Sequence, residues 1–267
     1  METTGRKESE AVQWFWKLKS LVEKVPGAFR VYKLVTSQTG EGKLYTIKRG
    51  PMAGVRWRRY NRLPYWYHLG LYEPQQSSYI QTHLREGETF WDIGAHAGYH
   101  AICAARVVGP RGRVIAVEPT PAIARIMREQ IALNNLRNIT VLEQAVSESE
   151  GEVTFMQSPR DSRSSAIAGL GIDGEAIQVP CTTLDHLLEQ YPAPAMLKMD
   201  IEGAEIFALP GGRRLFSGNK RPKHLLIGVH GDEARRYTED FFARHDYRLV
   251  SVPGFDDDVT LVGVRED

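Results

Sequence analysis

The chain has 267 residues, 42% of them hydrophobic and 25% charged, a balance that fits a compact α/β domain and excludes a disordered chain. Its net charge of +1 gives no electrostatic reason to expect nucleic acid as a partner. The two cysteines, Cys103 and Cys181, are too few for a disulfide framework or a zinc cluster, and no apolar run is long enough to span a bilayer. We therefore expect a cytoplasmic protein with no stable membrane insertion.

Apolar residues recur at helical spacing over residues 8–25, which predicts an amphipathic helix near the N-terminus. We expect this helix to pack on the main domain or on a neighbouring subunit of a homo-oligomer. Its tryptophans and lysines leave binding to a membrane surface as an alternative. Together with the segment that follows, the helix forms an expected extension over residues 1–75, and the main domain is expected over residues 76–267.

Residues 29–60 are rich in β-branched and aromatic side chains broken by glycine, a pattern typical of a small strand-and-turn region. Within it, Arg56 and Arg58 alternate with Val55 and Trp57. Alternation of this kind predicts that the arginines face solvent and the apolar side chains face inward. The alternative is a wall of arginines and aromatic rings for an acidic, sugar or nucleotide-bearing substrate.

The most informative segment is a predicted buried strand over residues 89–93, followed by a glycine turn and a helix over residues 99–108. Asp92, Gly94 and Gly98 give the spacing D-x-G-x-x-x-G, which differs from the G-x-G-x-x-G of dinucleotide folds. The glycines would let the backbone approach a ligand closely. Because an acid before the turn repels pyrophosphate and attracts an ammonium or sulfonium group, the segment predicts S-adenosylmethionine as the ligand.

A second acid, Glu118, ends the next predicted strand, residues 114–118, and lies 26 residues after Asp92. An acid near this spacing takes ribose hydroxyls in nucleotide-binding βαβ units. A predicted helix over residues 121–134 and a strand over residues 139–142 continue the alternation. Alternating strands and helices predict an α/β, Rossmann-like domain with a mostly parallel sheet and helices on both faces.

Two features interrupt this alternation. Residues 151–156 and 176–179 are predicted as extra short strands that flank a polar, glycine-spaced loop over residues 158–175. The loop either closes over substrate as a lid or is inert. Residues 247–252 and 259–264 predict a terminal hairpin.

Polar side chains end two further predicted strands, at the edge of the sheet where open α/β folds place ligands. Residues 196–201 deliver Lys198 and Asp200, and residues 225–230 deliver His230. We predict that His230 is the general base, because imidazole titrates near neutral pH, and that Asp200 orients it or contacts the cofactor. Lys198 lies inside an apolar strand, where a structural ion pair and a role in binding the acceptor are equally open.

The chain resembles the FkbM-type S-adenosylmethionine-dependent methyltransferases. The residues that carry the resemblance are Gly70–Pro74, Asp92–Tyr99, Val117–Pro119, Thr182–Asp185 and, most specific, Leu197–Glu205 with its K-x-D-x-E-G-x-E pattern. The resemblance implies a class I methyltransferase sheet with an antiparallel C-terminal edge. It also implies methyl transfer to oxygen of a small molecule or a sugar.

The expected cofactor-binding residues are Asp92, Gly94, His96, Gly98, Tyr99, Glu118, Gln144, Ala145 and Asp200. The family implies the adenine contacts, which fall just after the third strand. Two positions depart from the family: many members have asparagine in place of His96 and glutamate in place of Gly228. Without a carboxylate at 228, Asp200 and Glu202 alone are too few for a divalent cation, so we predict no metal.

Two other functions remain open from the sequence. An NAD-dependent oxidoreductase is disfavoured by the missing G-x-G-x-x-G pattern. A module that binds S-adenosylmethionine without turnover is disfavoured by the acids and the histidine at the strand ends.

Overall fold

The computed structural model describes residues 40–64, 66–157, 164–165, 175–253, 255 and 260–266. The predicted helix at 8–25 and nearly all of the predicted loop at 158–175 lie outside the described residues. The chain divides into two compact units, Met1–Tyr72 and Glu73–Asp267. Within the described part of the chain, no helix is both long enough and apolar enough to cross a membrane.

In the first unit, strands β1 (Leu44–Thr46) and β2 (Arg56–Arg58) pair in antiparallel fashion, and a short 3-10 helix, η1 (Tyr67–Leu69), follows. Trp57 is buried, and its ring meets the ring of Tyr67 edge-on at a centroid distance of 5.2 Å. The arginines on either side of Trp57 are exposed or half-buried. The predicted alternation of outward arginines and an inward tryptophan is therefore confirmed.

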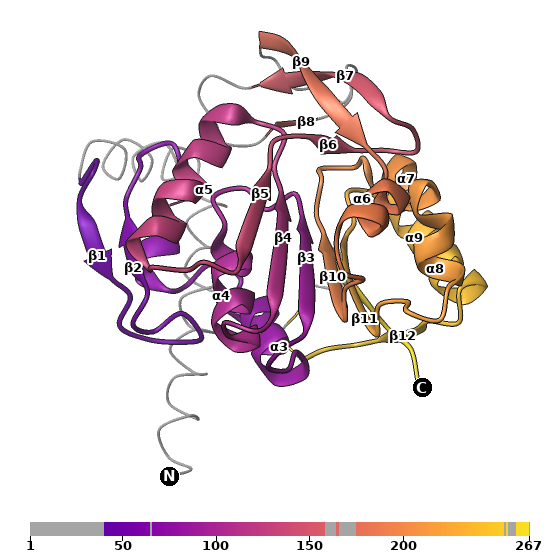
Figure 1. Ribbon diagram of the computed structural model, residues 1–267, viewed down its shortest axis with the longest axis horizontal. Coiled ribbons are helices and arrows are strands. Elements are labelled where there is room, and N and C mark those ends of the chain that lie inside the picture. The colour runs from indigo at the N-terminus through magenta and orange to yellow at the C-terminus, as the bar shows by residue number, and fades with distance from the viewer. Residues whose placement is uncertain are drawn as a thin grey trace, which may run out of the picture. The chain divides into compact units, whose positions relative to one another are not determined.

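The second unit is built on a seven-stranded sheet in the order β12-β13-β11-β10-β3-β4-β5 (Figure 1). Its strands are β3 (Thr89–Ile93), β4 (Arg113–Val117), β5 (Ile139–Leu142), β10 (Met196–Met199), β11 (His224–Gly228), β12 (Arg248–Val250) and β13 (Thr260–Val264). The pairs that join β5, β4, β3, β10 and β11 are parallel, and β13 is antiparallel to both of its neighbours. The predicted mostly parallel sheet with an antiparallel C-terminal hairpin is confirmed. The antiparallel strand lies one place inside the edge, which β12 forms.

Helices cover both faces of this sheet (Figure 1). On one face lie α3 (Pro74–His83), α4 (Tyr99–Val108) and α5 (Pro121–Leu133). On the other lie α6 (Leu184–Gln190), α7 (Glu205–Ala208), η2 (Leu209–Gly212), α8 (Arg213–Ser217) and α9 (Asp232–Arg244). The predicted bounds of the helix after β3 are confirmed, and those of the helix after β4 differ by one residue.

The central strands are buried on both faces, as parallel strands between two helical layers must be. Trp91 and Leu197 face the layer of α6, α8 and α9, where they join the main apolar core. Because side chains alternate along a strand, Asp92 and Lys198 face the opposite layer. The sheet therefore carries two charged side chains in its interior, a placement that requires polar partners.

A second, four-stranded sheet in the order β6-β9-β7-β8 lies beyond one end of the central sheet (Figure 1). Its strands are β6 (Ala145–Val146), β7 (Gly151–Gln157), β8 (Ser164–Ser165) and β9 (Glu175–Thr182). The two predicted extra strands are confirmed as β7 and β9, each longer than predicted. They are held by a small apolar core of their own, which includes Phe155 and Val179.

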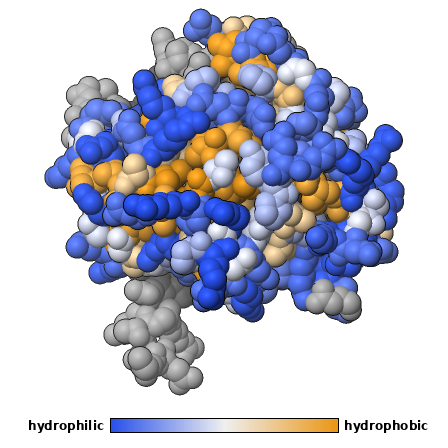
Figure 2. All heavy atoms as spheres, viewed as in Figure 1, coloured by the Kyte–Doolittle hydropathy of each residue, from blue (hydrophilic) through white to orange (hydrophobic). Residues whose placement is uncertain are grey.

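Hydrophilic residues cover most of the face drawn in Figure 2, and apolar residues reach the surface near its middle. Among the described residues, the large apolar side chains that are exposed are Leu44, Leu69, Phe207 and Leu249. Three of these four lie in β1, α7 or β12, which are only three or four residues long. Elements this short cannot bury all of their apolar side chains.

Candidate active site

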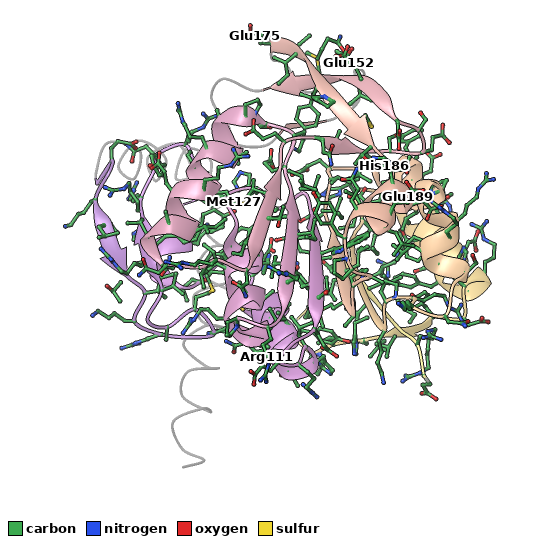
Figure 3. All side chains as sticks on the ribbon, in the orientation of Figure 1. Arg111, Met127, Glu152, Glu175, His186 and Glu189 are labelled. Carbon is green, nitrogen blue, oxygen red and sulfur yellow. The ribbon has the colours of Figure 1, made fainter. Side chains whose placement is uncertain are left out.

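The turn between β3 and α4 depends on its two glycines. Gly94 has φ +78° and Gly98 has φ +83°, a left-handed region that glycine adopts without strain. A Cβ on Gly94 would lie 2.0 Å from the carbonyl oxygen of Asp200. A Cβ on Gly98 would lie 2.6 Å from Cγ of Met127, which α5 supplies (Figure 3). The close approach that the sequence assigned to a ligand is thus made, at both glycines, by the protein itself.

Glu118, which directly follows β4, stabilises this turn through hydrogen bonds to the backbone. One of its carboxylate oxygens accepts a hydrogen bond from the backbone N–H of His96 at 3.0 Å, and the other accepts one from the backbone N–H of Thr120 at 2.8 Å. Burial raises the pKa of Glu118 to about 7. Each carboxylate oxygen has a second lone pair, so the ribose hydroxyls expected from the sequence could donate to the same group.

His96 contributes its main chain to this arrangement, with φ +50°. Histidine and asparagine are both enriched among non-glycine residues in the left-handed region. The departure from the family at position 96 therefore exchanges one residue type that tolerates this backbone for another.

Lys198 and Asp92 form an ion pair inside the sheet. The register of β10 and β3 places the two residues side by side, and Lys198 Nζ lies 3.5 Å from Oδ1 of Asp92 and 3.7 Å from Oδ2 of Asp200. The side chain of Lys198 is 5% exposed and that of Asp92 is 1% exposed. Burial alone would lower the pKa of Lys198, but the carboxylates of Asp92, Asp200 and Glu73 outweigh it and hold this pKa above its usual value.

Asp92 is short of hydrogen bonds. Among the described residues, neither carboxylate oxygen has a donor in full hydrogen-bond geometry, and the groups that compensate its charge are the Lys198 ammonium and the backbone N–H of Ala101. Burial raises the pKa of Asp92, against the opposing effect of Lys198. Because buried polar groups are nearly always satisfied, this carboxylate indicates a cationic or hydrogen-donating ligand.

His230 stands among three carboxylates just past the end of β11. Its Nε2 lies 3.4 Å from Oε2 of Glu202 and 3.7 Å from Oδ1 of Asp200, and its Nδ1 lies 3.8 Å from Oε1 of Glu205. The ring is 31% exposed, so a small molecule can reach it. The structure thus brings the predicted pair His230 and Asp200 together, and Lys198 lies on the far side of Asp200.

Glu205 is not among the predicted site residues, although it ends the K-x-D-x-E-G-x-E pattern. The side chain is fully buried, its Oε1 accepts a hydrogen bond from the backbone N–H of Ile201 at 2.7 Å, and its Oε2 has no donor within the described residues. Burial raises the pKa of Glu205 to about 7. The signal was present in the last acid of the K-x-D-x-E-G-x-E pattern, which folds back one turn onto the strand end.

Gly228 explains how Asp200 fits. A Cβ on Gly228 would lie 2.7 Å from Oδ1 of Asp200, so the Asp200 carboxylate occupies the space above this glycine. A glutamate here, as in many members of the family that the sequence resembles, would require Asp200 to move.

A metal ion is the other ligand that this cluster could hold. Asp200, Glu205 and His230 each offer a ligand atom, and these atoms lie within 4.8 Å of one another. Of these three residues, only Asp200 was counted in the sequence argument against a metal. The absence of a metal remains a prediction.

The predicted adenine contacts lie at the start of the second sheet. Gln144 is half-buried and lies two residues after the end of β5. Ala145 is buried and begins β6. Tyr99, also buried, is the first residue of α4. Tyr99 thus follows β3, and Gln144 and Ala145 follow β5, two strands that lie on either side of β4 in the sheet.

We predict that Gly94→Ala loses roughly 2–4 kcal/mol of unfolding free energy, because the new Cβ meets strain and a backbone oxygen together. Gly87→Ala is the matched control: Gly87 has φ +85° but nothing within 4 Å of the Cβ position. The control should lose only about 1 kcal/mol. Urea denaturation measures both, and equal losses would show that the contact with Asp200 contributes nothing.

We also predict a pH dependence from Glu205, whose folded-state pKa is raised from 4.5 to about 7. A raised pKa gives stability that is complete below pH 4.5 and is lost as the pH rises through 7. Glu205→Gln keeps a side-chain oxygen that accepts from the backbone N–H of Ile201, and it cannot ionise. It should match wild type near pH 4.5 and exceed it by roughly 3 kcal/mol at pH 8.

Denaturation of both proteins across this pH range tests the prediction, with the exposed Glu233→Gln as control. A difference between wild type and Glu205→Gln that stays constant with pH would contradict it.

The sequence model of the FkbM methyltransferase domain matches residues 92–249, more than half of the chain. This span contains the cofactor turn, Glu118, the ion pair and His230.

Three curated relatives are similar over parts of the chain. Protein-L-isoaspartate O-methyltransferase 1 of Archaeoglobus fulgidus is 41% identical over 59 residues, which are 22% of this chain and 27% of that protein. The arsenite methyltransferase of Halobacterium salinarum is 43% identical over 56 residues, 21% of this chain and 14% of that protein. The hexuronic acid methyltransferase AglP of Haloferax volcanii is 27% identical over 131 residues, 47% of this chain and 50% of that protein. The chain thus spans half or less of the length of each.

Solved structures were also matched. Precorrin-6y C5,15-methyltransferase of Geobacter metallireducens has 15% identity and a TM-score of 0.46, over 73% of this chain and 90% of that chain. Fibrillarin of Aeropyrum pernix with bound S-adenosylmethionine has 13% identity and a TM-score of 0.45, over 71% of this chain and 73% of that chain. Because the FkbM domain model matches residues 92–249, and because the strand order and the site described above agree with it, the chain belongs to the FkbM family of S-adenosylmethionine-dependent methyltransferases.

Proposed function

We propose that this methyltransferase methylates a hydroxyl group of a small molecule or a sugar, with His230 as the proton acceptor. The observation that carries the proposal is the position of His230: a partly exposed imidazole, surrounded by the carboxylates of Asp200, Glu202 and Glu205 at the strand ends that carry the family pattern. The oxidoreductase alternative is excluded by the family membership.

S-adenosylmethionine supplies a methyl group already activated by its sulfonium. In the transfer, the acceptor oxygen forms a bond to the methyl carbon, the carbon–sulfur bond breaks, and its electron pair stays on sulfur. The hydroxyl proton goes to a ring nitrogen of His230, and the imidazolium that results lies 3.4–3.8 Å from three carboxylates. Asp200 and Glu205 face opposite nitrogens of the ring, so together they hold its orientation.

The cofactor site follows the predicted residues. Asp92 and Asp200 would lie at the methionine end, and Glu118 would accept hydrogen bonds from the ribose hydroxyls. The remaining proposed contacts are the turn residues Gly94, His96, Gly98 and Tyr99 and the adenine-side residues Gln144 and Ala145. Two observations support this site: the buried Asp92 carboxylate, neither oxygen of which has a donor in full hydrogen-bond geometry, and the buried Glu118 carboxylate, which the backbone N–H groups of His96 and Thr120 hold at the turn.

The acceptor class rests on AglP, a relative that methylates a hexuronic acid by its name and aligns with 47% of this chain. The isoaspartate methyltransferases align with much shorter segments. Hexuronic acids and their glycosides are therefore the first acceptors to test.

We predict that His230→Gln lowers kcat by about 10²–10⁴-fold, the usual contribution of a general base, with little change in the Kd for S-adenosylmethionine. His186→Gln is the control, an exposed histidine on α6 that pairs with Glu150 and Glu189 (Figure 3). Release of the demethylated cofactor over a panel of hexuronic acids measures turnover, and calorimetry measures binding. Unchanged turnover in His230→Gln would refute the role of base.

A chelator separates this mechanism from metal catalysis. We expect that dialysis against EDTA leaves turnover unchanged, because His230 acts as a base and needs its nitrogen free. Loss of activity that Mg²⁺ or Mn²⁺ restores would instead make Asp200, Glu205 and His230 ligands of a cation.

A further inference from the structure

We infer that a second binding site lies beside the first residues of strand β11, and that it holds the phosphoryl group of a small molecule between Arg221 and Arg265. A surface pocket of about 420 Å³ lies there, a size that is usual for ligand pockets. The residues that line the pocket are Arg221, Asp246, Arg248, Val264, Arg265 and Glu266. None of them belongs to the candidate active site.

The pocket lies at the opposite end of the sheet from the catalytic residues. Val264 is the register partner of His224, the first residue of β11, and of Arg248, the first residue of β12. This end of β12 also lies near the C-terminus (Figure 1). Asp200 and His230 instead follow the last residues of β10 and β11. Because each residue of a strand adds about 3.3 Å, the length of β11 separates the two ends by roughly 13 Å.

Two arginines of the pocket hold buried nitrogen atoms without acceptors. Nε of Arg221 and Nε of Arg265 are both buried, and neither has a hydrogen-bond partner among the described residues. The side chain of Arg221 is 19% exposed. Because buried polar groups are nearly always satisfied, these two cationic groups indicate a ligand that brings its own acceptor atoms.

Both guanidinium groups lie close to the same buried hydroxyl group, that of Tyr247. This hydroxyl donates a hydrogen bond to the carbonyl of Pro222 at 2.6 Å. Burial raises the pKa of Tyr247, and the charges of Arg265 and Arg221 both oppose that rise. Two like charges close to one buried group repel each other, so an anion that contacts both would relieve the repulsion.

The two acids of the pocket compensate only part of its positive charge. Oδ2 of Asp246 lies 3.5 Å from Nη1 of Arg221, and Oε1 of Glu266 lies 3.4 Å from Nη2 of Arg248. These carboxylates are 80% and 82% exposed, and ion pairs at such positions contribute little. Arg265 is paired with neither acid, so the three arginines of the pocket exceed its two carboxylates.

A phosphoryl group matches this arrangement better than a carboxylate does. A guanidinium group donates two parallel hydrogen bonds to an oxyanion. A carboxylate has two oxygens, which one arginine can occupy. A phosphate monoester has three such oxygens and close to two negative charges at neutral pH. It can therefore accept from Arg221 and Arg265 together and balance more of the charge.

Calorimetry at constant ionic strength compares inorganic phosphate, glycerol 3-phosphate, acetate and glycerol. We expect both phosphates to bind, acetate to bind more weakly and glycerol not to bind. Tighter binding of glycerol 3-phosphate than of inorganic phosphate would assign the site to an ester, and any other order of these two would assign it to the free ion. Acetate that binds as tightly as phosphate would overturn the inference.

Arg265→Gln should weaken the binding of the phosphates roughly tenfold or more, because it removes a charge-assisted pair of hydrogen bonds. The matched control is Arg111→Gln, which removes the same charge from an exposed arginine outside the pocket that pairs with Glu86. The control should bind phosphate as wild type does. Wild-type affinity in Arg265→Gln would overturn the inference.

Two further measurements separate this site from the fold and from the cofactor site. Phosphate should raise the melting temperature of wild type and leave that of Arg265→Gln unchanged, since only the bound form is stabilised. An equal rise in both proteins would count against the site. Saturating S-adenosylmethionine should leave the affinity for phosphate unchanged, because the two sites lie at opposite ends of the sheet. Displacement of phosphate by the cofactor would place the anion in the cofactor site and refute the inference.

Discussion

The buried ion pair of Lys198 and Asp92 is the interaction on which the rest of the site depends. A charged group inside a parallel sheet is unfavourable unless its partner is also inside, and the matched register of β3 and β10 supplies that partner. Either side chain alone would leave an uncompensated charge between two helical layers. The pair therefore fixes which strand ends meet, and Asp200, two residues beyond Lys198, is carried to the rim beside the cofactor turn.

The turn and the rim then constrain each other. Gly94 packs on the carbonyl of Asp200, and Gly228 leaves room for the Asp200 side chain. The main chain of Asp200 is thus packed against one glycine and its side chain against another, with Oδ1 lying 3.7 Å from Nε2 of His230. Two glycines, one in the turn after β3 and one at the end of β11, thus position Asp200, whose carboxylate lies 3.7 Å from both Lys198 and His230.

Strong local patterns made most of the fold predictable. The buried strand at Thr89–Ile93 and the helix after it are apolar runs bounded by glycine, and their bounds were predicted to the residue. Helix α3 was not predicted, because its buried face carries Gln76 and Ser77 in place of apolar residues. The side-chain amide of Gln76 donates a hydrogen bond to Oγ1 of Thr260, which is 184 residues away in the sequence. In the site, Asp92, Asp200 and His230 stood at strand ends and could be predicted, whereas Glu205 reaches His230 through a turn with left-handed Glu202 that no periodicity reveals.

Glu118 has a consequence for the thermodynamics of cofactor binding. Its pKa of about 7 means that the carboxyl group is partly protonated in the free protein at neutral pH. Hydroxyl donors from a ribose favour the ionised form, so binding expels a fraction of a proton into the buffer. We expect the heat of binding to vary with the ionisation enthalpy of the buffer, and the cofactor affinity to increase with pH through neutrality. Glu118, which stabilises the turn through two backbone hydrogen bonds, thereby makes the occupancy of the cofactor site depend on pH.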